Sequence, residues 1–405
     1  HCLFQENKTD APLVLWLQGG PGKSALYGQY LEVGPVGIDA NERLYARNNT
    51  IQKEANIIFL DQPTGAGLSI LPNYTNPSYY AQMLTDMAVL IEEFLRQFVI
   101  LFAEYKGRKF YVAGESYGAR AAVGLAERLR CGYVINETIL PLSGVILGSG
   151  FLAPLLDLID SSDFLYNVRL LDEIGRQTFS QQFELIKTFV APGNRTNYTV
   201  ALYLLATTVL NLRIDGRRSL FQNLTGFTDH GNAIKPLRPP EADAYVKFVN
   251  TSKFKSDLHV PQGVKLDALR PMVATVLGMG DYFVSVEEVF KNVLENLNVL
   301  LYTAQLDAVF PSVNFDRYFR NMSWSRKAAF NKASKKSWSS CEKIPRLLGY
   351  VTKVGSLTYA TVLKAGHHTA RDEPYSVYDI MSRFIRDTNF AENLQCSNVS
   401  REETQ

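Results

Sequence analysis

The stretch at residues 109–130, KFYVAGESYGARAAVGLAERLR, constrains the fold of this chain more than any other. Its apolar start predicts a strand at 110–113, and its alanine- and leucine-rich end predicts a helix. Between them lies GESYG at 114–118, a match to G-x-S-x-G. In such a turn the residues that flank the serine must be small, and the helix N-terminus offers free N–H groups to an oxyanion. The stretch favours Ser116 as a nucleophile; the alternative is a glycine-rich turn whose serine has no role.

Further short apolar runs predict the other strands of a sheet. They lie at 11–17, 55–60, 143–150, 298–303 and 357–363. Amphipathic segments between and after them predict helices at 83–104, 285–297 and 375–387. Strands that alternate with helices in this way predict an α/β protein with a doubly wound, mostly parallel sheet. Together with the G-x-S-x-G turn, the pattern indicates an α/β-hydrolase fold.

The pattern changes between residues 151 and 284, where strand-like runs become rare. This segment predicts helices at 155–173, 177–189 and 200–212, joined by polar loops. We expect it to be a mainly helical cap inserted into a core formed by residues 1–150 and 285–405. A basic stretch at 326–336 is expected to be a solvated surface.

The length, composition and net charge of the chain argue against several classes of function. The 405 residues are 46% hydrophobic and 20% charged, an ordinary globular composition, and the net charge is only +2. This charge gives no reason to expect binding to nucleic acid or to an anionic membrane. No apolar run reaches the length of a membrane span, which is about 18 residues. The four cysteines are not spaced as a zinc site, and if all are bridged they allow three pairings: Cys2, Cys131, Cys341 and Cys396.

The chain is rich in N-x-S/T sequons, which indicates a glycoprotein of the secretory pathway, either secreted or lysosomal. The ten sequons start at Asn7, Asn48, Asn73, Asn136, Asn194, Asn197, Asn223, Asn250, Asn321 and Asn398.

Chain order narrows the choice of a catalytic histidine and acid, because in an α/β-hydrolase both follow the serine. Of the five histidines, His1 precedes Ser116, and two lie in the expected cap. His367 and His368 remain, just past the strand at 357–363. We predict that His367, which follows glycine, is the general base, with His368 as the alternative. Asp307 follows the strand at 298–303, where the acid that orients the histidine belongs; its alternative role is that of a helix cap or a loop acid.

The loop QGGPG at 18–22 directly follows the first predicted strand. Glycines there let backbone N–H groups approach a ligand closely, and one oxyanion donor of this fold comes from such an early loop. The other donor comes from the residue after the nucleophile. We therefore predict the backbone N–H groups of Gly20 and Tyr117 as the oxyanion hole; the alternative is a plain turn.

With these residues in place, the chain resembles the serine carboxypeptidases of peptidase family S10. The resemblance covers nearly the whole chain outside the cap. With glutamine at position 18 and no cysteine after GGPG, the chain resembles the vitellogenic-like branch more than the yeast or plant enzymes. The resemblance rests on six blocks in order: WLQGGPG at 16–22, EVGP at 32–35, DQPTGAGLS at 61–69, GESYG at 114–118, LYTAQLD at 301–307 and AGHH at 365–368. Members usually carry a further segment before the position of His1, so the chain looks truncated.

The resemblance implies release of C-terminal residues from peptides, with best activity at acidic pH. It also implies that Gln18, Glu32 and Glu115 bind the free carboxylate of the substrate, and that His368 lies beside the leaving-group pocket. Two neighbouring carboxyl groups cannot both ionise cheaply, so one would stay protonated and donate a hydrogen bond. Binding should then weaken as the pH rises. Lys23 stands where many members have a disulfide cysteine.

Two other kinds of function stay open. One is an acyltransferase or esterase on the same scaffold, and the other is a catalytically silent relative that acts by binding. For the leading hypothesis, we expect the partner to be a peptide or protein with a free C-terminus. No cofactor, metal, nucleic acid or membrane span is expected, and a homodimer is an alternative to a monomer.

Overall fold

A computed structural model describes residues 2–3, 10–132, 139–190, 197–209, 216–266, 271–340 and 344–388. Its main feature is a nine-stranded sheet with the strand order β1-β5-β2-β6-β7-β8-β11-β10-β9. The six strands from β5 to β11 in this order run parallel to one another. At one end β1 pairs antiparallel with β5, and at the other end β10 pairs antiparallel with β11 and β9 with β10. The bounds are β1 Cys2–Leu3, β2 Leu13–Leu17, β5 Asn56–Leu60, β6 Phe110–Glu115, β7 Leu142–Gly148, β8 Val299–Ala304, β9 Lys336–Ser339, β10 Leu347–Val354 and β11 Leu357–Val362. The predicted α/β-hydrolase fold with a mostly parallel sheet is thereby confirmed.

All six strands that the apolar runs predict are present, with ends within two residues of the expected positions. Strand β2 shows why they form. Its alternate side chains enter two different cores: Leu13, Leu15 and Leu17 face one side of the sheet, and Val14 and Trp16 face the other. A strand buried on both faces reads as a continuous apolar run.

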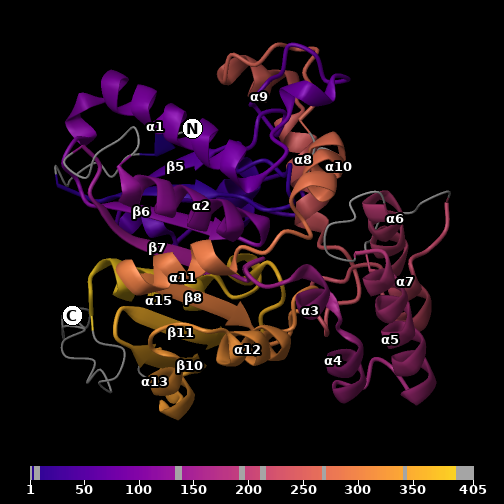
Figure 1. Ribbon diagram of the computed structural model, residues 1–405. Helices are drawn as coiled ribbons and strands as arrows, with labels where there is room; N and C mark the ends of the chain where they lie inside the picture. The colour runs from indigo at the N-terminus through magenta and orange to yellow at the C-terminus, as the bar shows by residue number, and fades with distance from the viewer. Residues whose placement is uncertain are drawn as a thin grey trace.

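Helices cover both faces of the sheet. On the first face pack α1 (Leu84–Leu101), α2 (Tyr117–Cys131) and α11 (Glu287–Asn296), and these three lie side by side in Figure 1. On the second face packs α15 (Pro374–Ile385), whose apolar side chains join those of Val14 and Trp16. Two core clusters on opposite faces are the expected result of a doubly wound sheet.

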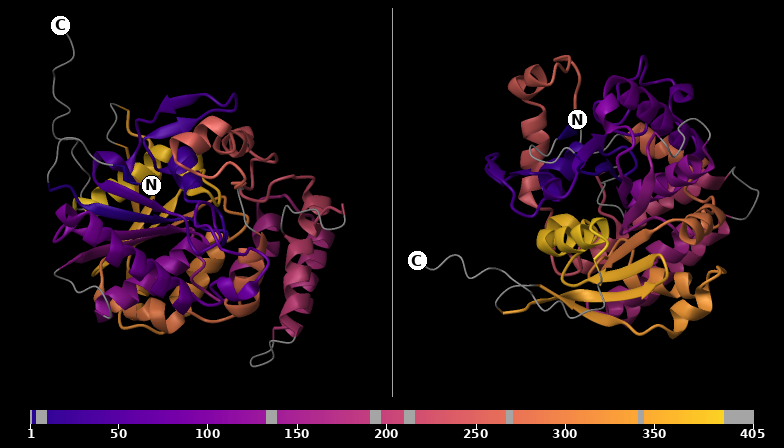
Figure 2. Two further views of the ribbon diagram at one scale, coloured as in Figure 1. Left: turned by 90° about the horizontal axis from the view of Figure 1, so that it is seen from above. Right: turned by 90° about the vertical axis from the view of Figure 1, so that its left-hand side faces the viewer.

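Between β7 and β8 the described residues form helices and contribute no strand to the large sheet. Helices α5 (Glu173–Thr188), α6 (Tyr198–Thr208) and α7 (Leu220–Thr225) stand together to one side of the sheet (Figure 1), and the view from above shows them projecting from the body of the protein (Figure 2). The other helices of this segment are α3 Leu155–Ile159, α4 Ser162–Asn167, α8 Pro240–Val249, α9 Ser252–Asp257 and α10 Pro271–Gly280. After β8 come α12 Ser312–Asn321 and, just past His368, α14 Thr369–Asp372.

The prediction of one helix at 155–173 is wrong, because this segment holds α3, α4 and the start of α5. The Asp160 carboxylate accepts hydrogen bonds from the backbone N–H and the hydroxyl of Ser162, and the Asp172 carboxylate accepts one from the Gly175 N–H. Short polar side chains that bind nearby backbone groups in this way compete with a continuing helix. Asp172 instead caps the start of α5.

The basic stretch at 326–336 is only in part the solvated surface that its charge predicts. It contains helix α13 (Lys327–Lys332), whose Phe330 is fully buried among aromatic neighbours, and it runs into β9. Strands β9 and β10 were not predicted. β10 carries Gly349 and Lys353 within its length, so it lacks the unbroken apolar run of a central strand.

The described residues show no disulfide. Cys131 is exposed and free. The side chains of Cys2, Cys341 and Cys396 lie outside the described residues, and so does His1.

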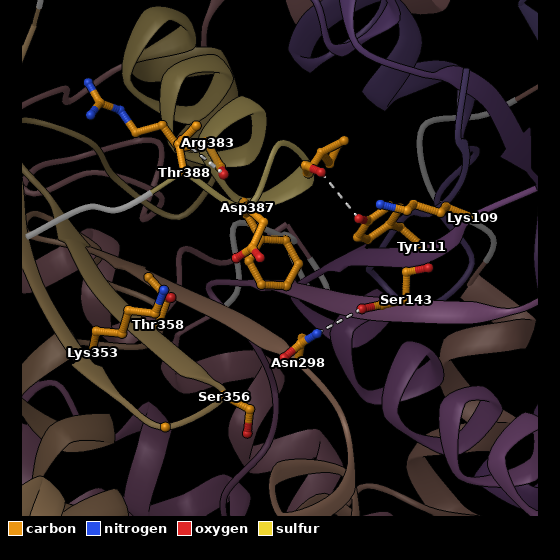
Figure 3. A pocket seen from close by; sticks show the side chains of 13 residues that line it. Lys109, Tyr111, Ser143, Asn298, Lys353, Ser356, Thr358, Arg383, Asp387 and Thr388 are labelled. Carbon is orange, nitrogen blue, oxygen red and sulfur yellow. Dashed lines mark hydrogen bonds between the residues drawn. The ribbon is translucent and has the colours of Figure 1, made fainter. Parts of the chain in front are cut away.

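A polar pocket lies at the amino ends of the strands (Figure 3). Its lining includes Lys109, Ser143 and Asn298, which precede or begin β6, β7 and β8. The residues expected in the catalytic site follow the carboxyl ends of these strands, where ligands bind in open α/β sheets. The pocket in Figure 3 is therefore separate from the candidate active site.

Candidate active site

The turn between β6 and α2 holds Ser116 in a strained backbone conformation, with φ 57° and ψ −122°. A non-glycine residue with positive φ persists only where its surroundings enforce it. The flanking glycines are part of that enforcement. A Cβ at Gly114 would lie 2.1 Å from the Gly118 carbonyl oxygen, and a Cβ at Gly118 would lie 2.0 Å from the Leu17 carbonyl oxygen. Gly114 therefore lets the turn close on itself, and Gly118 lets the turn pack against β2.

The structure brings Ser116, His367 and Asp307 together. His367 Nε2 lies 2.9 Å from Ser116 Oγ, and His367 Nδ1 lies 2.9 Å from Asp307 Oδ2. Asp307 is fully buried, and its other oxygen accepts hydrogen bonds from the backbone N–H groups of Val309 and Phe310 at 2.9 and 2.8 Å. The carboxylate is thus held in place from two sides. This is the geometry of a nucleophile, a base and an orienting acid.

The loop that carries His367 is anchored by a segment from the helical insertion. The His367 N–H donates to the Gly231 carbonyl oxygen at 2.7 Å, and Asn232 forms a β-bridge with Asp307. The Asp372 carboxylate accepts from the Asn232 side chain at 2.7 Å and from the Gly366 N–H at 2.8 Å. Sequence reasoning missed this contribution, because residues 231 and 367 are far apart in the chain and the loop at 231–232 has no motif.

The two expected oxyanion donors lie on adjacent backbone segments. Tyr117 is the first residue of α2, where N–H groups have no acceptor within the helix. The loop at 18–22 approaches it closely, since a Cβ at Gly19 would lie 3.1 Å from the Tyr117 nitrogen and 2.8 Å from Ser116 Cβ. Gly20 follows with a positive φ of 117° and is exposed. Tyr117 directly follows Ser116, and Gly20 directly follows a residue that lies against the Ser116 side chain. The role of their N–H groups as oxyanion donors stays a prediction.

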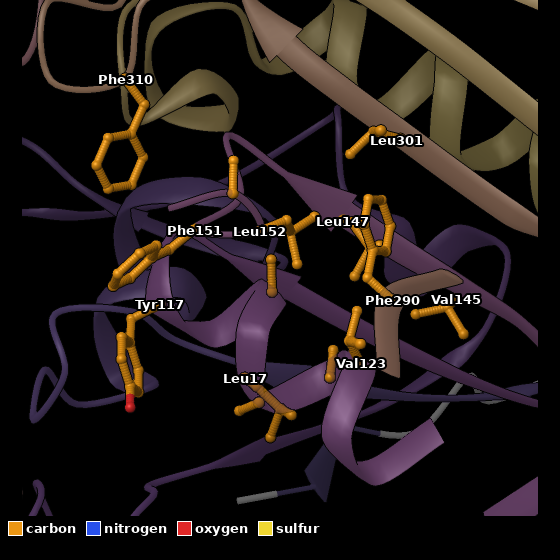
Figure 4. Packing of buried hydrophobic residues seen from close by; sticks show 14 of the residues in the cluster. Leu17, Tyr117, Val123, Val145, Leu147, Phe151, Leu152, Phe290, Leu301 and Phe310 are labelled. Carbon is orange, nitrogen blue, oxygen red and sulfur yellow. The ribbon is translucent and has the colours of Figure 1, made fainter. Parts of the chain in front are cut away.

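Aromatic side chains connect the turn to the histidine. Tyr117 packs on Phe151, Phe151 packs on Phe310, and Phe310 meets the His367 ring edge to face with the centroids 5.1 Å apart. Figure 4 shows the first three of these side chains in a row, beside aliphatic residues of the sheet. Ring packing of this kind limits the movement of His367.

A second cluster of buried polar side chains contains the residues expected to bind the substrate carboxylate. Gln18 receives a hydrogen bond from Trp16 Nε1 at 2.9 Å and donates one to Glu115 Oε2 at 3.3 Å. Glu32 reaches the cluster from the short helical turn Gly28–Glu32, and both glutamates are buried. The turn can pack there because residue 28 is glycine: a Cβ would lie 2.2 Å from Trp16 Nε1. Gln18, Glu32 and Glu115 thus come together as expected.

His368 joins this cluster and bridges the two glutamates. Its Nδ1 lies 3.1 Å from Glu32 Oε1 and 3.0 Å from Glu115 Oε2. On the other side of the ring, Nε2 lies 3.0 Å from the Nζ of Lys23. The family resemblance implied that His368 lies beside the leaving-group pocket. It did not predict the contacts of His368 with the glutamates or with Lys23. The resemblance singled out Lys23 only as a lysine at a position where many family members have a disulfide cysteine.

Burial perturbs the protonation of the whole cluster. Burial, and then the charge of Glu32, raises the pKa of Glu115 well above its usual range. Burial, and then the charge of Lys23, holds the pKa of His368 well below its usual value, so that the imidazole is neutral. Burial lowers the pKa of Lys23 to about 8, against the opposing attraction of Glu32. Perturbed groups of this kind gather at functional sites.

Glu32, Glu115 and His368 are also the group of described residues that could hold a metal ion, with ligand atoms within 4.8 Å of one another. The chemistry around them does not favour a cation. Lys23 approaches His368 Nε2 from the other side of the ring, and the charge of Arg371 acts on the same groups. The cluster fits hydrogen bonding to an organic anion better than metal binding.

Comparison with known proteins finds similarity to serine carboxypeptidases over nearly the whole chain. Residues 3–387 match the family model of serine carboxypeptidases, Peptidase_S10. The chain is 30% identical to the probable serine carboxypeptidase CPVL of Homo sapiens over 93% of this chain and 77% of the human protein. It is 29% identical to the venom serine carboxypeptidase of Apis mellifera, over 94% of this chain and 79% of the bee protein.

A solved structure supports the fold. The chain is similar to Kex1(Δ)p, a prohormone-processing carboxypeptidase from Saccharomyces cerevisiae, with a TM-score of 0.76 and 20% sequence identity, over 95% of this chain and 86% of the yeast chain. The family match, which spans the serine, the acid and the histidine described above, carries the assignment. The chain belongs to the serine carboxypeptidase family.

Proposed function

We propose that this protein is a serine carboxypeptidase that releases C-terminal residues from peptides through an acyl-enzyme on Ser116. The observation that carries the proposal is the pairing of two sites. A Ser116–His367–Asp307 constellation with 2.9 Å contacts lies next to a buried cluster that suits an anion. An endopeptidase has no need for such a cluster, whereas a carboxypeptidase must bind a free carboxylate.

The geometry supports the following chemistry. Ser116 Oγ attacks the carbonyl carbon of the last peptide bond while its proton passes to His367 Nε2. The backbone N–H groups of Gly20 and Tyr117 stabilise the oxyanion. His367 then protonates the leaving amine as the C–N bond breaks, and Asp307 stabilises the imidazolium throughout. Water, deprotonated by His367, hydrolyses the resulting ester and restores Ser116.

Acidic pH should favour this reaction. At low pH Glu115 is protonated and adds no negative charge to the cluster, because burial raises its pKa. As the pH climbs, its ionisation places a second negative charge beside Glu32 and repels the substrate carboxylate. The Michaelis constant for a peptide acid should therefore rise with pH.

The helical insertion at 151–284 is proposed to act as a cap over the site. Its segment at 230–233 supports this role, because it bonds to the loop of His367 and to the strand end at Asp307. The core would then consist of residues 1–150 and 285–405.

The proposed setting is the secretory pathway, with N-linked glycans, either outside the cell or in lysosomes. The ten sequons support it, and Asn48, Asn73, Asn223 and Asn321 are exposed. Among the described residues, every helix is too short or too polar to span a lipid bilayer. Whether the protein forms a homodimer stays a prediction.

The proposal is tested with a blocked dipeptide that has a free carboxylate, at about pH 4.5, near the ordinary pKa of a glutamate, and at about pH 7.5, well above it. Release of the C-terminal residue should be faster at the lower pH and absent in Ser116→Ala. Equal cleavage of the corresponding amide would favour an esterase or acyltransferase. No release by folded protein would favour a silent binding relative.

A further inference from the structure

The carboxyl groups of Glu32 and Glu115 are not open to an incoming substrate. Glu115 is 0% and Glu32 is 1% exposed, and one oxygen of each faces His368 Nδ1. The His368 side chain is 18% exposed and therefore lies on the solvent side of the glutamates. A substrate carboxylate that approaches the cluster meets the imidazole before it meets either glutamate.

The hydrogen bonds determine which nitrogen of His368 carries the proton. An ammonium group can only donate, so Nε2 accepts from Lys23 Nζ at 3.0 Å. The proton of the neutral imidazole is therefore on Nδ1, which faces the two glutamates. This tautomer makes a directional chain from Lys23 through His368 to the glutamates. The hydrogen bond from Lys23 to His368 therefore holds the Lys23 ammonium on the solvent side of the cluster.

Lys23 keeps donors available for a ligand. Its Nζ stacks over the Tyr27 ring at 3.6 Å from the centroid, and His368 Nε2 is its one hydrogen-bond acceptor among the described residues. No described carboxylate lies within 4.0 Å of it, and its side chain is only partly buried. An ammonium has three donors, so two remain for an anion.

The position suits the end of a substrate peptide. The rings of His367 and His368 are 5.6 Å apart, and His367 contacts Ser116. One residue spans about 3.3–3.6 Å, so the terminal carboxylate lies about one such step beyond the bond that Ser116 attacks. An anion site next to His368 meets this requirement.

We propose that Lys23, held in place by His368, is the residue that pairs with the C-terminal carboxylate of the substrate. Glu32 and Glu115 then act as positioning residues for His368. This inference rests on the proposed function, and it changes the mode of recognition from a protonated carboxyl group to a lysine ammonium. A charge-assisted hydrogen bond of this kind contributes about 1.5–3 kcal/mol.

The charged groups that face Lys23 set its pH dependence. Glu32 and Glu115 favour the ammonium, Arg371 and Arg238 oppose it, and burial opposes it most, which gives a pKa of about 8. The ammonium is present below this pH and is lost as the pH rises through it. Affinity for a peptide acid should therefore fall as Glu115 ionises and also near pH 8, where Lys23 loses its proton.

The test compares the wild type with Lys23→Met and Lys23→Arg on a blocked dipeptide acid and on the same dipeptide as its amide. In Lys23→Met, the Michaelis constant for the acid should rise about tenfold or more, with kcat little changed, and the constant for the amide should not move. Lys23→Arg keeps the charge and should stay within a few-fold of the wild type. The step near pH 8 should vanish in Lys23→Met.

Two controls separate the outcomes. Hydrolysis of a simple aryl ester without a carboxylate shows that Lys23→Met is folded and its triad intact. Lys335→Met, at an exposed lysine, should match the wild type. The role of Lys23 is overturned if the Michaelis constant for the acid is unchanged in Lys23→Met, or if it rises equally for acid and amide. Either result leaves the proposed function standing. A wild type that releases no residue from the acid overturns the proposed function, and this inference with it.

Discussion

The Tyr117 hydroxyl donates a 2.7 Å hydrogen bond to Asp281 Oδ2, which joins the residue after the nucleophile to the last part of the helical insertion. The same oxygen accepts from Arg120 Nε at 2.6 Å, and the guanidinium also reaches the Asp281 and Val284 carbonyl oxygens. The ion pair is almost fully buried. A helix that carries the nucleophile is thus bonded at its first turn to a distant segment of the chain.

Removal of Asp281 should destabilise the protein strongly. Asp281→Ala leaves the Arg120 charge buried without its partner, so the free energy of unfolding should fall by about 3–5 kcal/mol. Urea denaturation measures the change. Asp243→Ala breaks an exposed pair with Arg238 and should cost less than about 1 kcal/mol. Similar losses in the two variants would contradict the importance of the buried pair.

A methyl group at Gly118 should disable the turn. In Gly118→Ala the new Cβ would lie 2.0 Å from the Leu17 carbonyl oxygen, so the turn must shift away from β2. A displacement of about 1 Å at the nucleophile lowers kcat/KM about 100-fold. Peptidase kinetics on purified protein give the value. Gly263→Ala, where a Cβ meets nothing within 4 Å, should keep full activity.

Asp307→Asn should reduce turnover and leave the fold intact. The amide oxygen can still accept from the Val309 and Phe310 N–H groups, but it no longer stabilises the imidazolium. We expect kcat to fall about 10⁴-fold, with an unchanged circular dichroism spectrum. Asp257→Asn, on the exposed surface of α9, is the matched control. A loss of less than about tenfold would remove Asp307 from the triad.

The pH dependence should respond to Glu115→Gln. Glutamine keeps the shape of the side chain and cannot ionise, so the negative charge that appears as the pH rises is absent. Because burial raises the pKa of Glu115, the wild type gains this charge above the usual range of a carboxyl group. The Michaelis constant for a peptide acid should rise less steeply with pH in the variant. A pH profile identical to that of the wild type would assign the dependence to another group, and Glu42→Gln serves as the surface control.

The sequons should differ in occupancy. The Asn250 amide is engaged, since its nitrogen donates to the Val246 and Leu266 carbonyl oxygens and its oxygen accepts from the Leu266 N–H. The side chains of Asn73 and Asn223 are exposed to solvent. Mass spectrometry after enzymatic deglycosylation of protein secreted from eukaryotic cells should find glycans at exposed sites and none at Asn250. A glycan at Asn250 would mean that this loop adopts another conformation.

The sequence by itself determined the six parallel strands of the sheet and the turn at Ser116. It also determined which acid and which histidine follow the serine along the chain. Strands such as β2 and β5 are buried on both faces, so each is written as an unbroken apolar run. Within the turn, position 114 needs glycine because a Cβ there would meet the Gly118 carbonyl oxygen. Signals of this kind lie within a few residues of one another and can be read without the fold.

Only the tertiary structure decided what surrounds those residues. Strand β10 depends on pairing with β11, and the bend at Asp160 depends on a side-chain hydrogen bond, so neither has a strong periodic pattern. Lys23 and His368 meet across 345 positions, and their charges depend on burial that no local pattern encodes. Contacts between distant segments follow from how the sheet and loops pack, because a side chain acquires its partners and its pKa only when folding removes the surrounding water.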